Sequence, residues 1–168
     1  MDRSLTDRRA SVCAFIVVFI FAAAAAFSGR SDPVHAAVTP IPATTPIYSG
    51  YKGVKIGMTM EEARKLLGNP KEKSDAQDYF VFSDNESAQV VYDANHNVTI
   101  VSVTYMGKSS SRPTPLAVFG QDGETKPDGS ISIMVRYPKD GISISYNKTA
   151  GDDPLVMVTV QKIFGGPE

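Results

Sequence analysis

Residues 57–70 read GMTMEEARKLLGNP and hold the signals that start and stop a short α-helix. Thr59 can accept a hydrogen bond from the third helical amide, and Glu62 can reach back to the Thr59 amide, which together form a capping box. Acidic residues fall in the first turn and basic residues in the last turn, where the helix dipole favours each sign of charge. Gly68 supplies a left-handed C-cap, and Pro70 cannot continue the helix. We therefore predict a two-turn helix over residues 60–67.

The predicted helix is apolar on one side only. Met60, Ala63, Leu66 and Leu67 fall on one face at helical spacing. Two turns cannot bury such a stripe without a partner, because short helices owe their stability mostly to packing. The helix is therefore expected to lie on a sheet.

The residues after the helix supply that sheet. Runs rich in Val, Ile, Tyr and Phe are separated by short polar turns, which is typical of antiparallel hairpins. In the later runs, Ile and Val alternate with Ser, which predicts one packed face and one more polar face. A loop over 107–115 separates two groups of three strands, predicted at 79–83, 88–92, 98–105, 131–137, 141–146 and 155–164.

The fold class predicted from these elements is α+β, with a short capped helix packed on an antiparallel sheet of about six strands. Leu66-Leu67-Gly68 before the first three strands is echoed by Val118-Phe119-Gly120 before the second three. The pattern suggests a degenerate tandem repeat. In the second copy the helix cap is missing and the prolines leave room for about one turn at most.

The N-terminal residues have the composition of an export signal. Arg8 and Arg9 precede an apolar run over 12–27, and small residues follow it. Cleavage after Ser28 or after Ala36 fits the pattern, and we favour the second. The alternatives are an uncleaved membrane anchor and a twin-arginine signal.

The predicted organisation has three parts. A signal peptide or anchor covers 1–36, a Pro/Thr-rich tether covers 37–52, and a single domain covers 53–164, with a helix and three strands in 53–106 and three further strands in 115–164. Tyr48 and Tyr51, near the end of the tether, are expected to pack onto the domain. These features predict an exported protein of the periplasm or cell envelope, or a secreted one.

Charge and cysteine content narrow the function. Four of the 17 basic and three of the 18 acidic residues precede Ala37, which leaves 13 basic and 15 acidic side chains and a net charge of −2. Such a balance, with no basic block, argues against nucleic-acid binding, and it limits membrane contact to an uncleaved N-terminal segment. The single cysteine, Cys13, lies at the start of the apolar run, where a lipoprotein cysteine is not expected, so the rest of the chain forms no intramolecular disulfide.

No residue pattern predicts catalysis, a metal site or a cofactor. The histidines are His35, near the cleavage region, and His96, in a polar turn, where a solvated role is expected. The turn 93–97 begins like a calcium loop, but Val98 and Thr104 occupy the positions of the required glycine and acid. Asp152 and Asp153 are expected to be hydrated loop residues. The sequence therefore predicts a protein that is not an enzyme.

The stretch 53–104 resembles the small envelope domain of the SmpA/OmlA (BamE) outer-membrane assembly lipoproteins and the related repeat of the β-lactamase-inhibitor-protein-like fold. The resemblance is carried by Ile56-Gly57-Met58-Thr59, Glu62, Leu66-Leu67-Gly68, Pro70 and Tyr92-Asp93. The chain departs from the assembly lipoproteins in having no lipobox cysteine and in having a second group of strands. The resemblance implies an α+β domain that works by contacting other proteins.

The leading hypothesis is a non-enzymatic domain that binds a protein partner through a sheet face or loops. One alternative is a module that binds a small ligand or an ion. The other is an inhibitor of a secreted enzyme that acts through the loop 107–115 or the loop 122–129.

Overall fold

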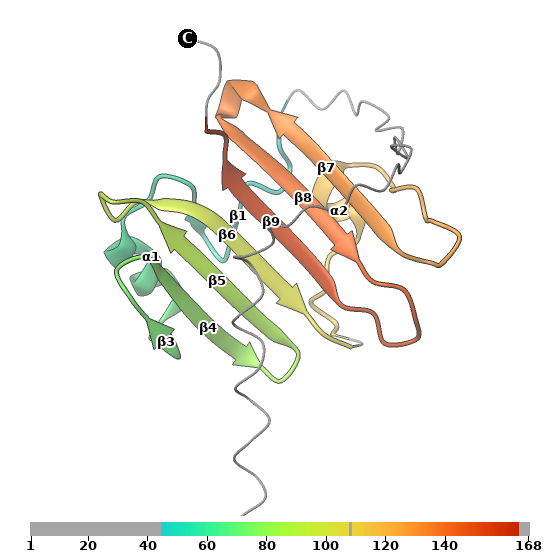
Figure 1. Cartoon of the computed structure of the whole chain (residues 1–168), viewed down its shortest axis with the longest axis horizontal. Coiled ribbons are helices and arrows are strands. Elements are labelled where there is room, and N and C mark those ends of the chain that lie inside the picture. The colour runs from blue at the N-terminus through green and yellow to red at the C-terminus, as the bar shows by residue number, and fades with distance from the viewer. Residues whose placement is uncertain (1–44, 108, 165–168) are drawn as a thin grey trace, which may run out of the picture. The chain divides into compact units, whose positions relative to one another are not determined.

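The computed structural model describes residues 45–107 and 109–164 (Figure 1). The predicted signal peptide, with Cys13 and His35, and the first half of the predicted tether lie outside the described residues.

A seven-stranded antiparallel sheet forms the body of the domain (Figure 1). Its strand order is β3-β4-β5-β6-β9-β8-β7, and β1 and β2 form a separate two-stranded ribbon. The strands are β1 Gly50–Tyr51, β2 Val54–Lys55, β3 Glu72–Lys73, β4 Gln77–Ser83, β5 Glu86–Tyr92, β6 Val98–Tyr105, β7 Ile131–Tyr137, β8 Ile142–Lys148 and β9 Val156–Lys162.

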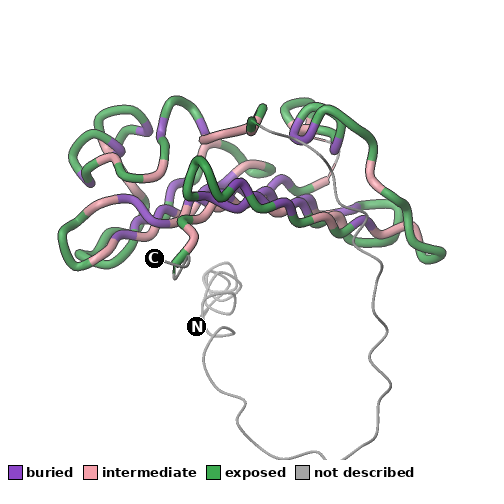
Figure 2. The backbone as a smooth tube through the Cα atoms, turned by 90° about the horizontal axis from the view of Figure 1, so that it is seen from above, coloured by how far each residue is buried: buried purple, intermediate pink, exposed green. Residues whose placement is uncertain are grey.

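The helices α1, Met60–Leu67, and α2, Pro115–Phe119, lie on the same side of the sheet (Figure 2). The sheet residues that face them are buried and apolar. This core face includes Phe80, Ala88, Val90, Val101, Val103, Ile144, Val158 and Val160. The α+β prediction is confirmed, and the main sheet gains β3 as a seventh strand.

The start of α1 confirms the capping box. The Glu62 amide donates to Thr59 Oγ1 at 3.3 Å, and the Thr59 amide donates to Glu62 Oε2 at 2.9 Å. The end of α1 differs from the prediction, because Gly68 has φ 87° and ψ −158°, which is outside the left-handed helical region. Leu66 differs as well: it is 48% exposed, while Met60, Ala63 and Leu67 are buried.

The prediction that the second copy has no helix cap is wrong. Thr114 Oγ1 accepts a hydrogen bond from the Ala117 amide at 3.2 Å, and Gly120 ends α2 in the left-handed conformation. Pro115 occupies the first turn, where its missing N–H costs nothing. The five residues of α2 agree with the predicted limit of about one turn.

The strand order agrees with the predicted tandem repeat. β4, β5 and β6 follow α1, while β7, β8 and β9 follow α2, and each group forms consecutive antiparallel pairs. The groups meet where β6 pairs with β9, Val103 opposite Val158. The order 4-5-6-9-8-7 is that of two like units joined through their last strands. We call this β6–β9 pairing the seam.

The folded domain begins before residue 53, where the sequence placed its start. Gly50 and Tyr51, in the predicted tether, pair with Lys55 and Val54. Tyr51 is buried, as expected for packing onto the domain. The 3₁₀ turn η1, Pro138–Asp140, ends at Gly141 with φ 67°, in agreement with the predicted hairpin turn.

Candidate functional site

The side of the sheet away from the helices forms a regular surface of three rows. Each row crosses the strands in the order β4, β5, β6, β9, β8 and β7, because antiparallel partners point to the same side of a sheet. We call these positions the open face. The rows are Gln77-Val91-Ile100-Gln161-Ser143-Arg136, Tyr79-Gln89-Ser102-Thr159-Ser145-Met134 and Val81-Ser87-Thr104-Met157-Asn147-Ser132.

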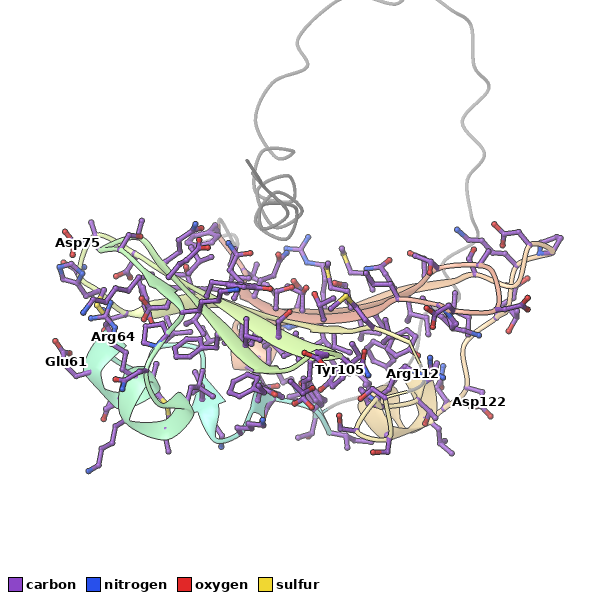
Figure 3. All side chains as sticks on the ribbon, turned by 90° about the horizontal axis from the view of Figure 1, so that it is seen from below. Glu61, Arg64, Asp75, Tyr105, Arg112 and Asp122 are labelled. Atoms are coloured by element: carbon purple, nitrogen blue, oxygen red, sulfur yellow. The ribbon has the colours of Figure 1, made fainter. Side chains whose placement is uncertain are left out.

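The open face is almost free of charge. Arg136 is the one charged side chain among the residues of these three rows, although charged residues make up 21% of the chain. At the margin of the open face, Glu72 of β3 lies opposite Tyr79 and is charged as well. Glu61, Arg112 and Asp122 all lie on the helix side of the sheet (Figure 3). Depletion of charged residues distinguishes the centre of protein interfaces from ordinary surface, more reliably than overall hydrophobicity does.

Four large apolar side chains are exposed on the open face. Val81 is 46% exposed and Tyr79 37%, both on β4. Met134 on β7 is 56% exposed, and Met157 on β9 is 36% exposed. These side chains are spread over the face among hydroxyl and amide groups. Such a mixture is typical of non-obligate protein interfaces.

Several polar groups of the open face already hydrogen-bond to each other. Gln89 Nε2 donates to Gln77 Oε1 at 2.8 Å, and Ser132 Oγ donates to Asn147 Oδ1 at 2.8 Å. The hydroxyls of Ser102 and Thr159 lie 2.9 Å apart across the seam. Burial of a polar group costs little free energy when its hydrogen bond is kept. A partner could therefore cover these groups without leaving them unpaired.

The size of the open face suits protein binding. Six strands at about 4.8 Å spacing, and three rows about 7 Å apart, give on the order of 600 Å². Each partner in a standard protein interface contributes about 800 Å². The open face with its surrounding turns is of that order.

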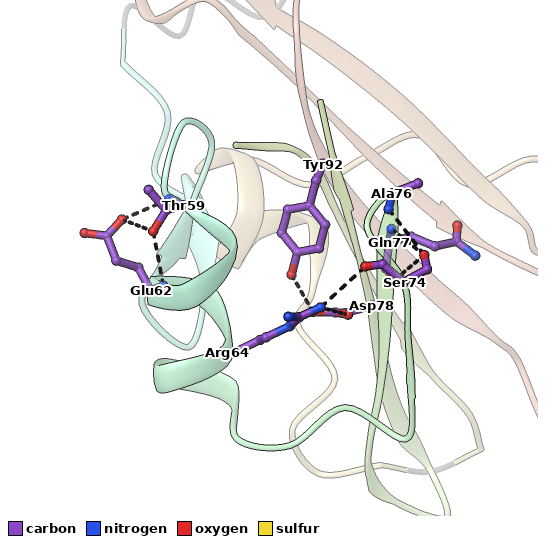
Figure 4. A network of polar contacts seen from close by, with 8 residues as sticks. All are labelled: Thr59, Glu62, Arg64, Ser74, Ala76, Gln77, Asp78 and Tyr92. Carbon is purple, nitrogen blue, oxygen red and sulfur yellow. Dashed lines mark hydrogen bonds and ion pairs between the residues drawn. The ribbon is translucent and has the colours of Figure 1, made fainter. Parts of the chain in front are cut away.

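Among the described residues, one acidic side chain is buried on the helix side, and it holds α1 to the sheet (Figure 4). Asp78 on β4 is fully buried. Its Oδ2 accepts from Arg64 Nε at 2.8 Å and from the Tyr92 hydroxyl at 2.7 Å, and its Oδ1 accepts from Arg64 Nη2 at 2.9 Å. Burial, followed by the hydrogen bond to Asp78, raises the pKa of Tyr92. All parts of this cluster satisfy each other, so we assign it a structural role.

A second polar cluster surrounds Glu86 at the start of β5. Its carboxylate accepts hydrogen bonds from the hydroxyls of Tyr51 and Ser111, the latter at 2.6 Å, and pairs with Lys52 Nζ at 3.3 Å. Burial alone would raise the pKa of Glu86, but these hydrogen bonds outweigh burial and lower the pKa. The Lys52 ammonium also lies 3.6 Å from the centre of the Phe82 ring. The cluster ties residues 51–52 and the loop after β6 to the sheet.

The Asp93 side chain stabilises the turn 93–97 through hydrogen bonds to its backbone. Asp93 Oδ1 accepts from the amides of Asn95 and Asn97, both at 2.9 Å, and His96 is exposed with φ 58°. The hydrogen bond from the Asn97 backbone amide contributes most to lowering the pKa of Asp93. An open hollow of about 320 Å³ adjoins the turn, lined by Asp75, Ala76, Tyr92, Asp93, Ala94 and His96.

The other candidate residues form no metal site. Asp152 and Asp153 are exposed in the loop before β9. Within residues 45–107 and 109–164, no three His, Cys, Asp or Glu side chains are grouped closely enough to hold a metal ion. In the same part of the chain, no helix has the length and apolar character needed to cross a membrane.

The two loops proposed for enzyme inhibition differ in how they are held. In the loop 107–115, Arg112 Nη1 donates to the Gly107 carbonyl at 3.0 Å, and the Tyr146 hydroxyl donates to the Pro113 carbonyl at 3.3 Å. In the loop 122–129, the Lys126 amide donates to the Ser130 carbonyl at 2.9 Å, and the Gly129 amide donates to the Lys126 carbonyl at 2.8 Å. The loop 107–115 is therefore anchored to the sheet through Tyr146, whereas these hydrogen bonds of the loop 122–129 join residues 126–130 to each other.

Sequence reasoning missed Asp78, because it started the strand at residue 79. The alternation of Phe82, Phe80 and Asp78 continues backward through that start and would have placed Asp78 on the core side. The three rows of the open face were also missed as a unit, since they depend on the seam, which joins strands far apart in sequence.

No protein-family model matches this chain, and neither does any curated protein or any solved structure. The resemblance to the SmpA/OmlA (BamE) domain and to the inhibitor-like repeat stays a prediction.

Proposed function

We propose that this chain is a non-enzymatic protein-interaction domain, and that the open face is its binding surface. The observation that carries the proposal is the near absence of charge over three rows of six residues, together with four exposed apolar side chains. A sheet face that only meets water has no need to exclude charge, whereas the centre of an interface does.

The proposed place of action is outside the cytoplasm, in the cell envelope or the secreted space. The support is the composition of residues 1–36, with paired arginines before a long apolar run. The resemblance to envelope assembly domains agrees with this location. The partner that we propose is therefore an envelope or secreted protein.

A matched pair of positions tests the binding surface. Val81 on the open face is 46% exposed, and Leu66 on the helix side is 48% exposed. A photo-crosslinking amino acid is placed at each position, and the chain is irradiated in detergent-solubilised envelopes. We expect a defined crosslinked protein from position 81 and none from position 66.

Charge substitutions at the same two positions complete the test. Val81→Arg places a cation on the open face, where it would need to be desolvated on binding, and Leu66→Arg adds the same charge on the helix side. We expect Val81→Arg to abolish co-purification of the crosslinked protein and Leu66→Arg to leave it unchanged. Equal crosslinking from both positions, or equal retention by both variants, would refute the open face as the binding surface.

A further inference from the structure

The outer strands of the two units, β4 and β7, differ in whether another strand covers their outer edge. The edge of β4 is partly covered by β3, which pairs with Asp78 and Tyr79. Two further backbone hydrogen bonds, from Lys71 to Tyr79 at 2.8 Å and from Ser74 to Gln77 at 2.9 Å, extend this cover. β3 itself is two residues long and charged, a common way to stop a sheet from growing.

The edge of β7 has no such cover within the described residues. β7 is the outermost strand on its side and pairs only with β8 (Figure 1). The loop before it reaches the side chains of Ile131 and Ile133 at Gly123, on the core side. Among residues 45–107 and 109–164, no backbone hydrogen bond joins β7 to that loop. Seven residues of strand thus present one row of free backbone donors and acceptors.

The sequence of β7 suits pairing with itself. An antiparallel pair of identical strands related by a two-fold axis keeps the same face of each sheet on the same side. The arrangement that overlaps all seven residues is centred on Met134. It places Met134 opposite Met134 of the second copy, Ile133 opposite Val135, and Ser132 opposite Arg136.

This arrangement has no unfavourable contact between charges. The one charged residue of β7, Arg136, faces Ser132 of the other copy and not a second arginine. On the core side, Ile133 faces Val135, and such β-branched pairs stabilise neighbouring strands. The molecule already contains a junction of this kind, since β6 and β9 join its two similar units edge to edge at the seam.

We infer that two copies of this chain associate through β7 into one continuous sheet, with the two open faces side by side. The interface is a seven-residue antiparallel pairing centred on Met134. The inference does not depend on the proposed function, because it concerns the edge of the sheet and not the open face.

Disulfide trapping tests the geometry in the full chain with Cys13→Ser. Directly opposed residues in antiparallel strands have Cα atoms about 4.5 to 5.5 Å apart, which a disulfide can span. Met134→Cys should therefore form a covalent dimer on mild oxidation. Met157→Cys is the control on an inner strand of the same face, and Ser132→Cys is the control for register, because residue 132 faces residue 136.

The expected result is efficient crosslinking of Met134→Cys and little of either control. A mixture of Ser132→Cys and Arg136→Cys chains should form mixed dimers. Crosslinking of Met157→Cys as strong as that of Met134→Cys would overturn the inference, because it would indicate contact through the open faces or random collision.

Sedimentation velocity over a range of concentrations tests association without a crosslink. Met134 is 56% exposed, so Met134→Lys should fold, and it places two like charges opposite each other. We expect the dimer to dissociate about tenfold more readily in this variant. Leu116→Lys on α2, at a residue 52% exposed, is the matched control and should match the unsubstituted chain. A chain that stays monomeric at every concentration would overturn the inference.

Discussion

Replacing Arg64 by methionine should destabilise the fold more than any other change at an exposed or half-exposed position of α1. The substitution keeps the apolar stem of the side chain and removes the guanidinium. Arg64 supplies two of the three hydrogen bonds that Asp78 receives from side chains, at 2.8 and 2.9 Å, and the Tyr92 hydroxyl supplies the third at 2.7 Å. Since Asp78 is fully buried, the variant leaves a buried carboxylate with one partner.

The size of the effect follows from that burial. Removing one partner of a buried ion pair costs about 3 to 5 kcal/mol, because the remaining charge stays away from water. Asp78→Asn should cost less, about 1 to 2 kcal/mol, since the amide still offers a carbonyl oxygen and no charge is left buried. The order of the two variants is the sharper expectation. The Arg64 side chain is 31% exposed, so its charge still meets water when Asp78 is replaced. The Asp78 side chain is not exposed at all, so its charge stays buried when Arg64 is replaced.

Urea unfolding followed by circular dichroism measures these differences. The double variant Arg64→Met/Asp78→Asn should be less destabilised than the sum of the single variants, since the stranded charge is gone. A loss below about 1 kcal/mol for Arg64→Met would refute the reasoning. A larger loss for Asp78→Asn than for Arg64→Met would also refute it.

Three further expectations test the local structure. Thr59→Ala removes the acceptor for the Glu62 amide and should lower the free energy of unfolding by about 1 kcal/mol. Urea unfolding measures this loss, and Thr149→Ser, a conservative change outside α1, is the control. Gly50→Ala would place a Cβ in a clash with the Val54 carbonyl oxygen, so amide exchange at residues 50–55 should accelerate while the sheet stays protected. Unchanged exchange would contradict the β1–β2 pairing. Glu86→Gln should weaken the attachment of residues 51–52. Because the pKa of Glu86 is lowered from 4.5, the loss of stability in the variant should be largest above pH 4.5 and shrink as the pH falls further. A loss of stability that grows in acid would refute the lowered pKa.

The sequence predicted what is local in this fold. Thr59, Glu62 and Pro70 all lie within residues 59–70, and the helix they define is the one observed. The hairpins followed from turns such as Asp84-Asn85 and from the alternation in β7 and β8, because register there is fixed by short connections.

What depends on distant parts of the chain could not be predicted. The seam joins Val103 to Val158, and no local pattern selects that pairing over others. The burial of Asp78 depends on Arg64, which belongs to a different element. The cap of α2 was not predicted, although it is local: Thr114 lies directly before Pro115, which occupies the first turn, where proline is well tolerated.

The position of β9 changes what a shortened chain would lose. Residues 156–162 form the last strand along the chain, yet β9 lies inside the sheet, fifth from the β3 edge and third from the β7 edge, between β6 and β8. During synthesis, Val101 and Val103 are made long before the segment that covers their flank. A chain that stops before β9 would therefore lack the strand that joins β6 to β8, and its two units would be separated.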